Sequence, residues 1–225
     1  MVTYRNTLAE DHANATVNRY FAALSHAFTV AVSEWQWCTD DPVHRIRKTR
    51  ETQGRTRYLS ETERRDLLAA CQKSRNPYLY TVVVLALTTG ARRGELLSLR
   101  WPNVDLKRGV LTFQTTKNGE TRTVPLPSFA LEALVKHAAQ RYGGGHFVFP
   151  NATDKGPMSI RGAFRGALKH AGVRDFRFHD LRHTAASYLA MNGASLLEIA
   201  EILGHKTLAI VKRLSGIVSR RNCLS

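Results

Sequence analysis

The chain has 225 residues, enough for one well-buried domain and a smaller piece, and its 43% hydrophobic content excludes a wholly disordered protein. Lys and Arg number 33 against 18 Asp and Glu, which gives a formal net charge of +15. Such an excess favours a polyanionic partner, because neutralising phosphates releases condensed counterions. A protein that merely has a basic surface is the simpler alternative.

Cysteine usage and hydropathy favour a cytoplasmic protein. Cys38, Cys71 and Cys223 are odd in number and far apart, so they match neither a disulfide framework nor a CxxC metal site. The N-terminus lacks the layout of a signal peptide, and no apolar run approaches the ~18–20 residues that span a bilayer. We therefore expect no membrane partner.

Residues 1–42 predict part of a small helical module. Apolar side chains from Val17 to Trp35 recur at steps of three and four, which indicates a helix from about residue 13 to 37. One amphipathic helix cannot bury itself, so the segment is interpreted as one part of a helical domain.

Residues 43–58 predict an interdomain linker, because they follow Pro42 and are basic and weakly hydrophobic. The stretch is suited to lie along DNA phosphates, although a merely solvated linker explains it equally well. Its candidate DNA-binding residues are Arg45, Arg47, Lys48, Arg50, Arg55 and Arg57.

Residues 59–225 predict an α+β domain that is mainly α, with a small antiparallel sheet. Ser60 and Glu63 form a capping box that begins a helix. Two β-rich runs flank Asn118-Gly119, which is a strong hairpin signal. The other expected elements are helices near 77–88, from Arg93, and near 159–171, 180–191, 195–203 and 207–214, with a further short strand at 146–149.

The stretch from His179 to His183 carries the most chemistry. Metal-free phosphodiester exchange needs cations on the non-bridging oxygens, and a proton donor and acceptor near the attacking and leaving oxygens. Arg182 suits the first task, because its planar fork binds phosphate bidentately. His179 suits the second, because an imidazole titrates near neutrality. Two residues three apart at the start of a helix project in the same direction.

Other segments suit the same chemistry. Gly90 is able to end a helix and let Arg92 enter a cleft, where Glu95 could orient the guanidinium. Lys117 lies at the edge of the predicted hairpin turn. The Leu-Gly-His205 sequence matches a helix C-cap glycine followed by an imidazole.

Five positions, taken in order and with their spacing, resemble the tyrosine recombinases, the phage-integrase family of site-specific DNA breaking-and-rejoining enzymes: Arg92, Lys117, His179, Arg182 and His205. The resemblance covers residues from about 60 to 213, and the segment before residue 58 is similar to the end of the family's helical core-binding domain. It implies a duplex DNA partner, no need for ATP, metal or another cofactor, and a homo-tetramer on paired sites. It also implies a prokaryotic, nucleoid-associated protein.

The resemblance further implies a role for each of these positions. Arg92 and Arg182 would clamp the scissile phosphate. Lys117 would protonate the 5′-oxygen leaving group, and His179 would act in general acid–base catalysis. His205 would hydrogen-bond a non-bridging oxygen.

One departure from the family pattern is severe. The family's tyrosine nucleophile lies nine residues after the histidine of the Leu-Gly-His sequence, where this chain has Leu214. Leucine has no nucleophilic atom, and Ser215 would point ~100° away on a helix, with no evident base. The tail after Arg213 also leaves the pattern. We therefore expect that the chain by itself does not cleave DNA.

A zinc hydrolase is a remote alternative. His179 and His183 have the i, i+4 spacing of a zinc-protease helix, with Glu201 as a possible third ligand. However, Asp180 replaces the general-base glutamate, and Arg182 would put a cation beside the metal. We therefore expect no metal, and we interpret His183 as a packed histidine that supports the site.

A non-catalytic DNA-binding protein is the stronger alternative. Residues 195–213 match a helix-turn-helix with Gly204 in the turn. That interpretation leaves Arg92, Lys117 and His179 unexplained, so the recombinase interpretation is preferred.

Overall fold

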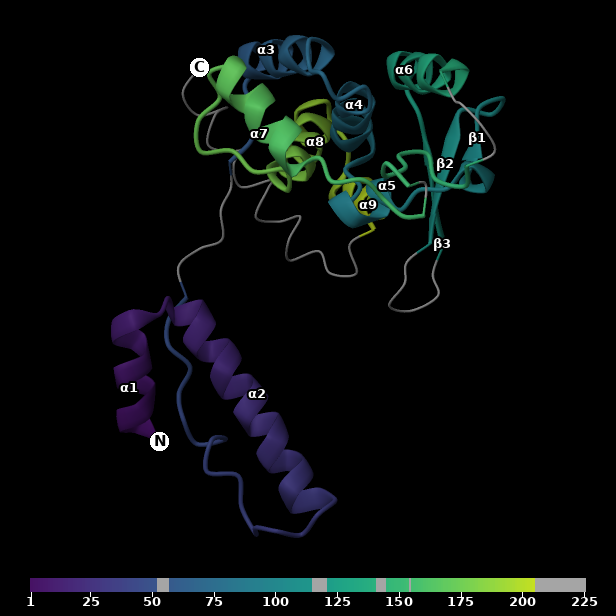
Figure 1. Ribbon diagram of the computed structural model, residues 1–225. Coiled ribbons are helices and arrows are strands. Elements are labelled where there is room, and N and C mark those ends of the chain that lie inside the picture. The colour runs from purple at the N-terminus through teal and green to yellow at the C-terminus, as the bar shows by residue number, and fades with distance from the viewer. Residues whose placement is uncertain (52–56, 115–120, 141–144, 154, 205–225) are drawn as a thin grey trace. The chain divides into compact units, whose positions relative to one another are not determined.

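The computed structural model describes residues 1–51, 57–114, 121–140, 145–153 and 155–204. By their internal contacts the residues divide into two units, Met1–Arg55 and Thr56–Ser225 (Figure 1). None of the described helices is both long and apolar enough to cross a bilayer.

The first unit consists of helix α1 (Val2–Asp11), helix α2 (Asn14–Ser33) and the segment that follows them. Helix α2 confirms the predicted amphipathic helix, with Val17 and Phe21 buried on its apolar face. Helix α1 was not predicted, because it buries no residue and has almost no amphipathic pattern to detect.

The segment predicted as a linker packs on the first unit over residues 43–51. Val43 is buried in the same small core as Val17. Asn18, itself buried, donates from Nδ2 to the carbonyl of Thr49 at 2.8 Å, and the Thr49 N–H returns a bond to Asn18 Oδ1 at 2.9 Å. These bonds tie the extended segment along α2.

The second unit has the predicted class: mainly helices with a small antiparallel sheet. Its elements are α3 (Glu61–Gln72), α4 (Leu79–Thr89), α5 (Arg93–Leu97), a 3-10 turn (Trp101–Asn103), β1 (Val104–Asp105), β2 (Val110–Gln114), β3 (Thr121–Pro125), α6 (Ser128–Ala139), α7 (Arg161–His170), α8 (Asp180–Met191) and α9 (Leu196–Leu203). Helix α6 was not predicted. The candidate strand at 146–149 is reduced to one bridge, between Arg100 and Phe147, and the helix expected at 207–214 lies outside the described residues.

The hairpin prediction is confirmed. The sheet has the order β1-β2-β3, and β2 and β3 pair antiparallel with Leu111 opposite Val124 and Phe113 opposite Arg122. Leu111, Phe113 and Val124 are buried, so this face of the hairpin joins the core. The turn itself, with Lys117, lies outside the described residues.

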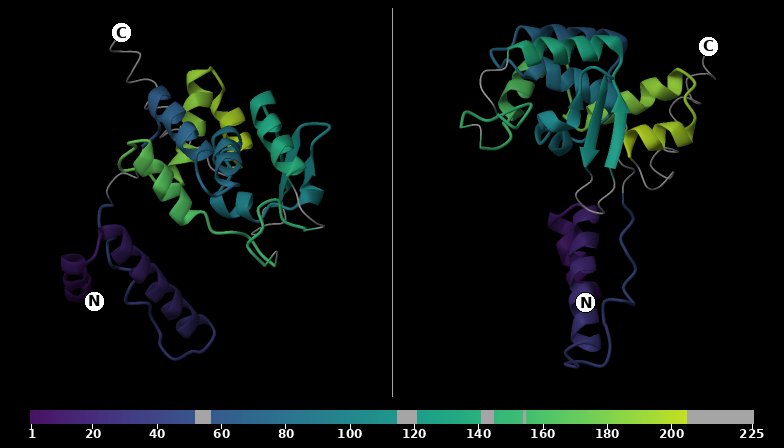
Figure 2. Two further views of the ribbon diagram at one scale, coloured as in Figure 1. Left: turned by 45° about the horizontal axis from the view of Figure 1, so that its top comes forward. Right: turned by 90° about the vertical axis from the view of Figure 1, so that its right-hand side faces the viewer.

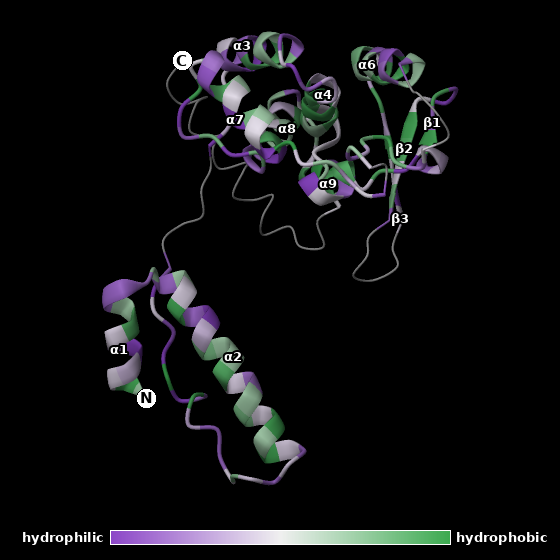
Figure 3. Cartoon of the chain, in the orientation of Figure 1, coloured by the Kyte–Doolittle hydropathy of each residue, from purple (hydrophilic) through white to green (hydrophobic). Residues whose placement is uncertain are grey.

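Helix α4 is the centre of the second unit. It is apolar along nearly its whole length (Figure 3), and it packs against α3, α6 and α8. Two views show the other helices gathered around it, with the sheet beside α6 (Figure 2). A helix that is hydrophobic on all sides is stable only when it is enclosed in this way. The position of α4 is therefore fixed by the helices packed around it.

Candidate functional site

The C-terminal ends of α4 and α9 meet at the centre of the site. Helix α4 ends at Gly90, which has a left-handed φ of 58°, and α9 ends at Gly204 with a φ of 64°. A Cβ atom on Gly90 would lie 2.1 Å from Cδ2 of Leu203. Only glycine satisfies both the backbone angle and this close approach.

Arg182 on α8 joins these two helix ends. Its side chain is buried, with 3% of the residue exposed, and it donates from Nη1 to the Gly90 carbonyl at 2.7 Å and from Nη2 to the Leu203 carbonyl at 2.6 Å. Both carbonyls belong to helix C-termini, where the helix dipole is negative and stabilises a cation. Burial first, and then the charges of Arg92 and Arg122, lower the pKa of Arg182 to about 9, which leaves it a cation at neutral pH.

Arg92 and Glu95 form a local pair at the start of α5. The Arg92 backbone N–H donates to Glu95 Oε2 at 2.9 Å, and Arg92 Nη1 donates to Glu95 Oε1 at 2.7 Å. The Arg92 side chain is 47% exposed, whereas that of Glu95 is 16% exposed. Burial opposes ionisation of Glu95, but its bonds from Arg92 and the charge of Arg122 together hold its pKa below the usual range. The pair therefore presents an oriented, accessible guanidinium.

Sequence reasoning missed Arg122 on β3. Its Nη2 donates to Glu95 Oε2 at 3.1 Å, its Nη1 donates to the Ile202 carbonyl at 2.6 Å, and its guanidinium lies 5.1 Å from the Phe113 ring centre. The only available signal was its place in the strand: Arg122 is two residues from buried Val124 and so points to the core face. Arg92, Arg122 and Arg182 with Glu95 are called the arginine cluster below.

His179 lies beside this cluster at the N-cap of α8. Partial burial and the charges of Arg182 and Arg92 lower its pKa, against the opposing charge of Asp180. The imidazole is therefore mainly neutral at pH 7. Its ring meets that of His183 edge to face, with centroids 5.2 Å apart. No group of three His, Cys, Asp or Glu with the geometry of a metal site occurs in the described part of the chain.

Two of the other predicted site residues bind acidic side chains outside the cluster. Arg57 is bound to Glu63, which forms the capping box of α3 with Ser60, and stacks 5.5 Å from the Phe176 ring centre. Arg45 forms an ion pair with Asp40 at 2.9 Å. The exposed residues Arg45, Arg47, Lys48 and Arg50 lie in the first unit and are called the basic strip below. Arg55, Lys117, His205 and Leu214 lie outside the described residues.

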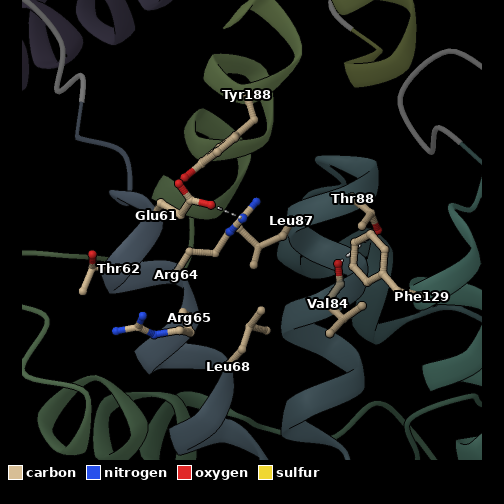
Figure 4. Close-up of a pocket in the computed structure, with 10 residues that line it drawn as sticks. All are labelled: Glu61, Thr62, Arg64, Arg65, Leu68, Val84, Leu87, Thr88, Phe129 and Tyr188. Carbon is tan, nitrogen blue, oxygen red and sulfur yellow. Dashed lines mark hydrogen bonds and ion pairs between the residues drawn. The ribbon is translucent and has the colours of Figure 1, made fainter. Parts of the chain in front are cut away.

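A separate cavity of about 640 Å³ lies between α3, α4, α6 and α8 (Figure 4). Arg64 crosses it, 4.6 Å from the Tyr188 ring centre and 3.8 Å from Glu61. Phe129 and Leu87 contribute apolar walls. None of the arginine-cluster residues or His179 lines it, so this cavity is separate from the candidate site.

Clustered arginines suit a phosphate group, because a planar guanidinium binds phosphate bidentately and keeps its proton. The model of the phage integrase family matches residues 57–214, and the chain belongs to that family. The resemblance to tyrosine recombinases is thereby confirmed.

Known proteins agree with this assignment. The chain is 36% identical over 199 residues to a shufflon-specific DNA recombinase of Escherichia coli, a match that covers 88% of this chain and 50% of that protein. The structure of the bacteriophage HP1 integrase catalytic domain is similar at 31% identity and a TM-score of 0.58, covering 71% of this chain and 86% of that one.

The Tn1549 transposon integrase, solved in complex with a circular intermediate DNA, has a TM-score of 0.77 at 17% identity, covering 98% and 83% of the two chains, and shows the shared fold. The chain spans about half the length of the curated relatives it matches, 50% and 55% for two of them.

Proposed function

We propose that this chain binds duplex DNA and holds one backbone phosphodiester in the arginine cluster, as the DNA-binding and phosphate-activating part of a site-specific recombinase. The observation that carries the proposal is the arrangement of Arg92 and Arg182 at the joined ends of α4 and α9. Arg182 bonds the carbonyls of Gly90 and Leu203, and Arg92 is the N-cap residue of α5, two residues after Gly90. The charges of both arginines also lower the pKa of His179 at the N-cap of α8. Arg92 and Arg122 both bond the one carboxylate of Glu95, and Arg182 bonds only backbone carbonyls, so the cluster has an excess of positive charge for a phosphate. Membership of the phage integrase family supports the same conclusion.

The roles proposed for individual residues follow from their surroundings. Arg92, half exposed and oriented by Glu95, would bind one non-bridging oxygen. Arg182 would bind another with the part of its guanidinium that does not reach the two helix carbonyls. His179, mainly neutral, would accept a proton near the reacting oxygens. Fixed cations stabilise the charge that a pentavalent phosphate develops, without metal.

Three further roles are proposed for residues outside the described part of the chain. Lys117 would protonate the leaving 5′-oxygen, and His205 would bind a non-bridging oxygen. Leu214 occupies the position of the attacking tyrosine and has no group that could form a covalent bond to phosphorus. The chain would therefore hold the phosphodiester without breaking it.

The direct test is to restore the nucleophile. Leu214→Tyr would be incubated with a pool of nicked duplexes whose sequence is randomised around the nick, and covalent adduct would be counted on a denaturing gel. We expect adduct from Leu214→Tyr and none from the unaltered chain. Adduct from the unaltered chain would overturn the proposed lack of cleavage. DNA binding without adduct from Leu214→Tyr would overturn the proposed phosphate-activating site.

A matched control uses the exposed arginine of the cluster. Arg92→Met in the Leu214→Tyr chain removes the exposed guanidinium of Arg92. It leaves in place the bond from buried Arg182 to the Gly90 carbonyl at the end of α4. We expect the adduct to fall by at least about tenfold, because a hydrogen bond to a charged group is lost at the reacting phosphate. An unchanged yield would remove Arg92 from the proposed role.

A helix-turn-helix is the second candidate function. Its first helix would be α9, which begins with a capping box between Ser195 and Glu198 and ends in the left-handed Gly204. Its second helix would fall outside the described residues. Arg92→Met, whose bonds go to Glu95 and not to α9, would leave this mode of binding unchanged, whereas Lys206→Gln with Lys212→Gln would weaken it. Weaker binding by the arginine variant, with unchanged binding by the double lysine variant, would favour the arginine cluster.

The larger assembly is also a proposal. Residues 1–42 would be the end of a core-binding domain, residues 43–58 its connection, and residues 59–225 the catalytic domain. Four chains would meet on two paired DNA sites, which in a prokaryotic cell places the protein on the nucleoid. Sedimentation of the full chain with DNA carrying two sites would give the mass of a tetramer, and a monomer at every concentration would contradict the assembly.

A further inference from the structure

Arg122 links three elements of the second unit through one side chain. From β3 it reaches Glu95 on α5, the Ile202 carbonyl at the end of α9, and the ring of Phe113 on β2. The contacts with Glu95 and Ile202 span 27 and 80 residues of sequence. A side chain that joins elements so far apart in the chain fixes how they sit together.

The burial of Arg122 makes these contacts costly to lose. Its side chain is only 13% exposed, and burial lowers the pKa of its guanidinium while the charge of Glu95 opposes that shift. Removing one partner of a buried pair leaves the other charge without compensation. Glu95, 16% exposed, would therefore change its position or its bonds if Arg122 were absent.

Glu95 divides its two oxygens between two arginines. Oε2 accepts both the Arg92 backbone N–H and Arg122 Nη2, whereas Oε1 accepts Arg92 Nη1. Arg122 thus holds the carboxylate in the rotation that leaves Oε1 for the Arg92 guanidinium. Because Arg92 is half exposed on a long flexible stem, its direction depends on that carboxylate.

The same guanidinium helps to fix the end of α9. The last carbonyls of a helix have no partner within it. Here Arg122 bonds the Ile202 carbonyl and Arg182 bonds the Leu203 carbonyl. A Cβ atom on Gly204 would lie 3.2 Å from Cδ of Arg122, so the glycine also leaves room for this arginine.

We propose that Arg122 is a positioning residue for phosphate binding: it orients Arg92 through Glu95 and holds the end of α9 against the cluster. The proposal rests on the proposed function, in which Arg92 binds a backbone phosphate. Arg122 itself, bound to Glu95 and Ile202, is assigned no contact with the phosphate.

The test is a double-mutant cycle on DNA affinity, measured with the full chain by fluorescence anisotropy on a fluorescein-labelled pool of random duplexes. The variants are Arg92→Met, Arg122→Met and both together. Arg100→Met is the matched control, because Arg100 also lies over a phenylalanine ring, 5.2 Å from the centre of Phe147, but is exposed. Thermal unfolding of each variant checks that it is folded.

We expect Arg92→Met to weaken binding by about tenfold in the unaltered chain and by less than about twofold in the Arg122→Met chain, because residues that share one hydrogen-bond network, here through Glu95, are not additive. Arg100→Met should leave the effect of Arg92→Met unchanged. If the losses from Arg92→Met and Arg122→Met multiply, Arg122 does not act through Arg92 and the inference is overturned while the proposed function stands. If Arg92→Met has no effect alone, the proposed function falls and the inference with it.

A second measurement does not depend on DNA. The titration of Glu95 can be followed by carbon-13 NMR of labelled glutamate, with the signal assigned from Glu95→Gln. We expect the pKa of Glu95 to rise in Arg122→Met, because a neighbouring cation is lost, and to stay nearer its original value in Arg122→Lys. An unchanged pKa of Glu95 in Arg122→Met would show that Arg122 does not hold Glu95, and would overturn the inference. This outcome does not depend on whether Arg122→Met also lowers the stability of the chain.

Discussion

Two regions of this protein carry concentrated positive charge, and they differ in how that charge is held. In the arginine cluster of the second unit, Arg182 is 3% exposed and the Arg122 side chain 13% exposed. In the basic strip of the first unit, the Arg45 side chain is 81% exposed, and its partner Asp40 is 62% exposed. A buried guanidinium is costly unless it has a hydrogen-bonding partner, so the arginine cluster provides such partners. The exposed side chains of the basic strip are instead solvated by water.

The consequence is a difference in what each region is able to recognise. The cluster fixes its side chains through helix carbonyls and Glu95, so it suits one phosphate in one place. The strip is held to the first unit through its backbone, by the bonds between Asn18 and Thr49, while its basic side chains are exposed to solvent. It suits a row of phosphates with no fixed register. Surroundings, more than charge, distinguish a site from a basic surface.

The largest effect is expected at the helix junction beneath the cluster. Gly90→Ala adds a Cβ atom 2.1 Å from Leu203 Cδ2 at a left-handed φ of 58°. We expect the free energy of unfolding of the second unit to fall by ~2–4 kcal/mol, the sum of backbone strain and overpacking. Urea unfolding followed by circular dichroism measures it.

Gly94→Ala is the control for that prediction. Gly94 lies in α5, close to the cluster, but its added Cβ would meet nothing within 4 Å. We expect a change within about 1 kcal/mol, in the stabilising direction, because alanine is the better helix former. Equal losses from Gly90→Ala and Gly94→Ala would show that the two helix ends are not packed as closely as described.

A smaller effect is expected from pH. The pKa of Glu95 is lowered in the folded chain, so its pairing stabilises the fold above the unfolded value of about 4.3 and is lost as pH falls through the lower folded value. Glu95→Gln should therefore be less stable than the unaltered chain by ~1–3 kcal/mol at pH 7. The two should approach each other below about pH 4.

Denaturant unfolding at a series of pH values measures this difference. Glu61→Gln is the comparison, because its carboxylate is 86% exposed and lies 3.8 Å from Arg64 in a surface ion pair. An exposed pair contributes at most about 1 kcal/mol. A pH-independent gap between Glu95→Gln and the unaltered chain would mean that the carboxylate charge does not stabilise the cluster.

Local patterns account for what the sequence predicted of this fold and site. The capping box of Ser60 and Glu63, the hairpin and the start of α8 at His179 each depend on residues within a few positions of one another. The pairing of Arg92 with Glu95 is equally local, three residues apart. Such signals survive in a sequence read alone, because chain connectivity already brings the partners together.

Long-range contacts account for what the sequence did not predict. Arg122 meets Ile202 across 80 residues, and no pattern of spacing records that meeting. Arg57, which the basic stretch predicts to contact DNA, stacks on the ring of Phe176, a residue far from it in the sequence. The sequence shows how many cationic side chains the protein has. The folded structure shows which of them are already bound to another group of the protein.

The smallest effect on stability, and the clearest on DNA, is expected in the basic strip. Arg45→Gln with Arg47→Gln should change the free energy of unfolding by less than about 0.5 kcal/mol, since both side chains are exposed. Affinity for duplex DNA should fall equally for all sequences, and the slope of log affinity against log salt should decrease by about 1 per charge removed. Arg65→Gln, also exposed and on α3, is the control and should leave the slope unchanged. An unchanged salt dependence in Arg45→Gln with Arg47→Gln would mean that the basic strip does not contact DNA. Of the two described regions compared here, the arginine cluster alone would then remain a candidate for phosphate binding.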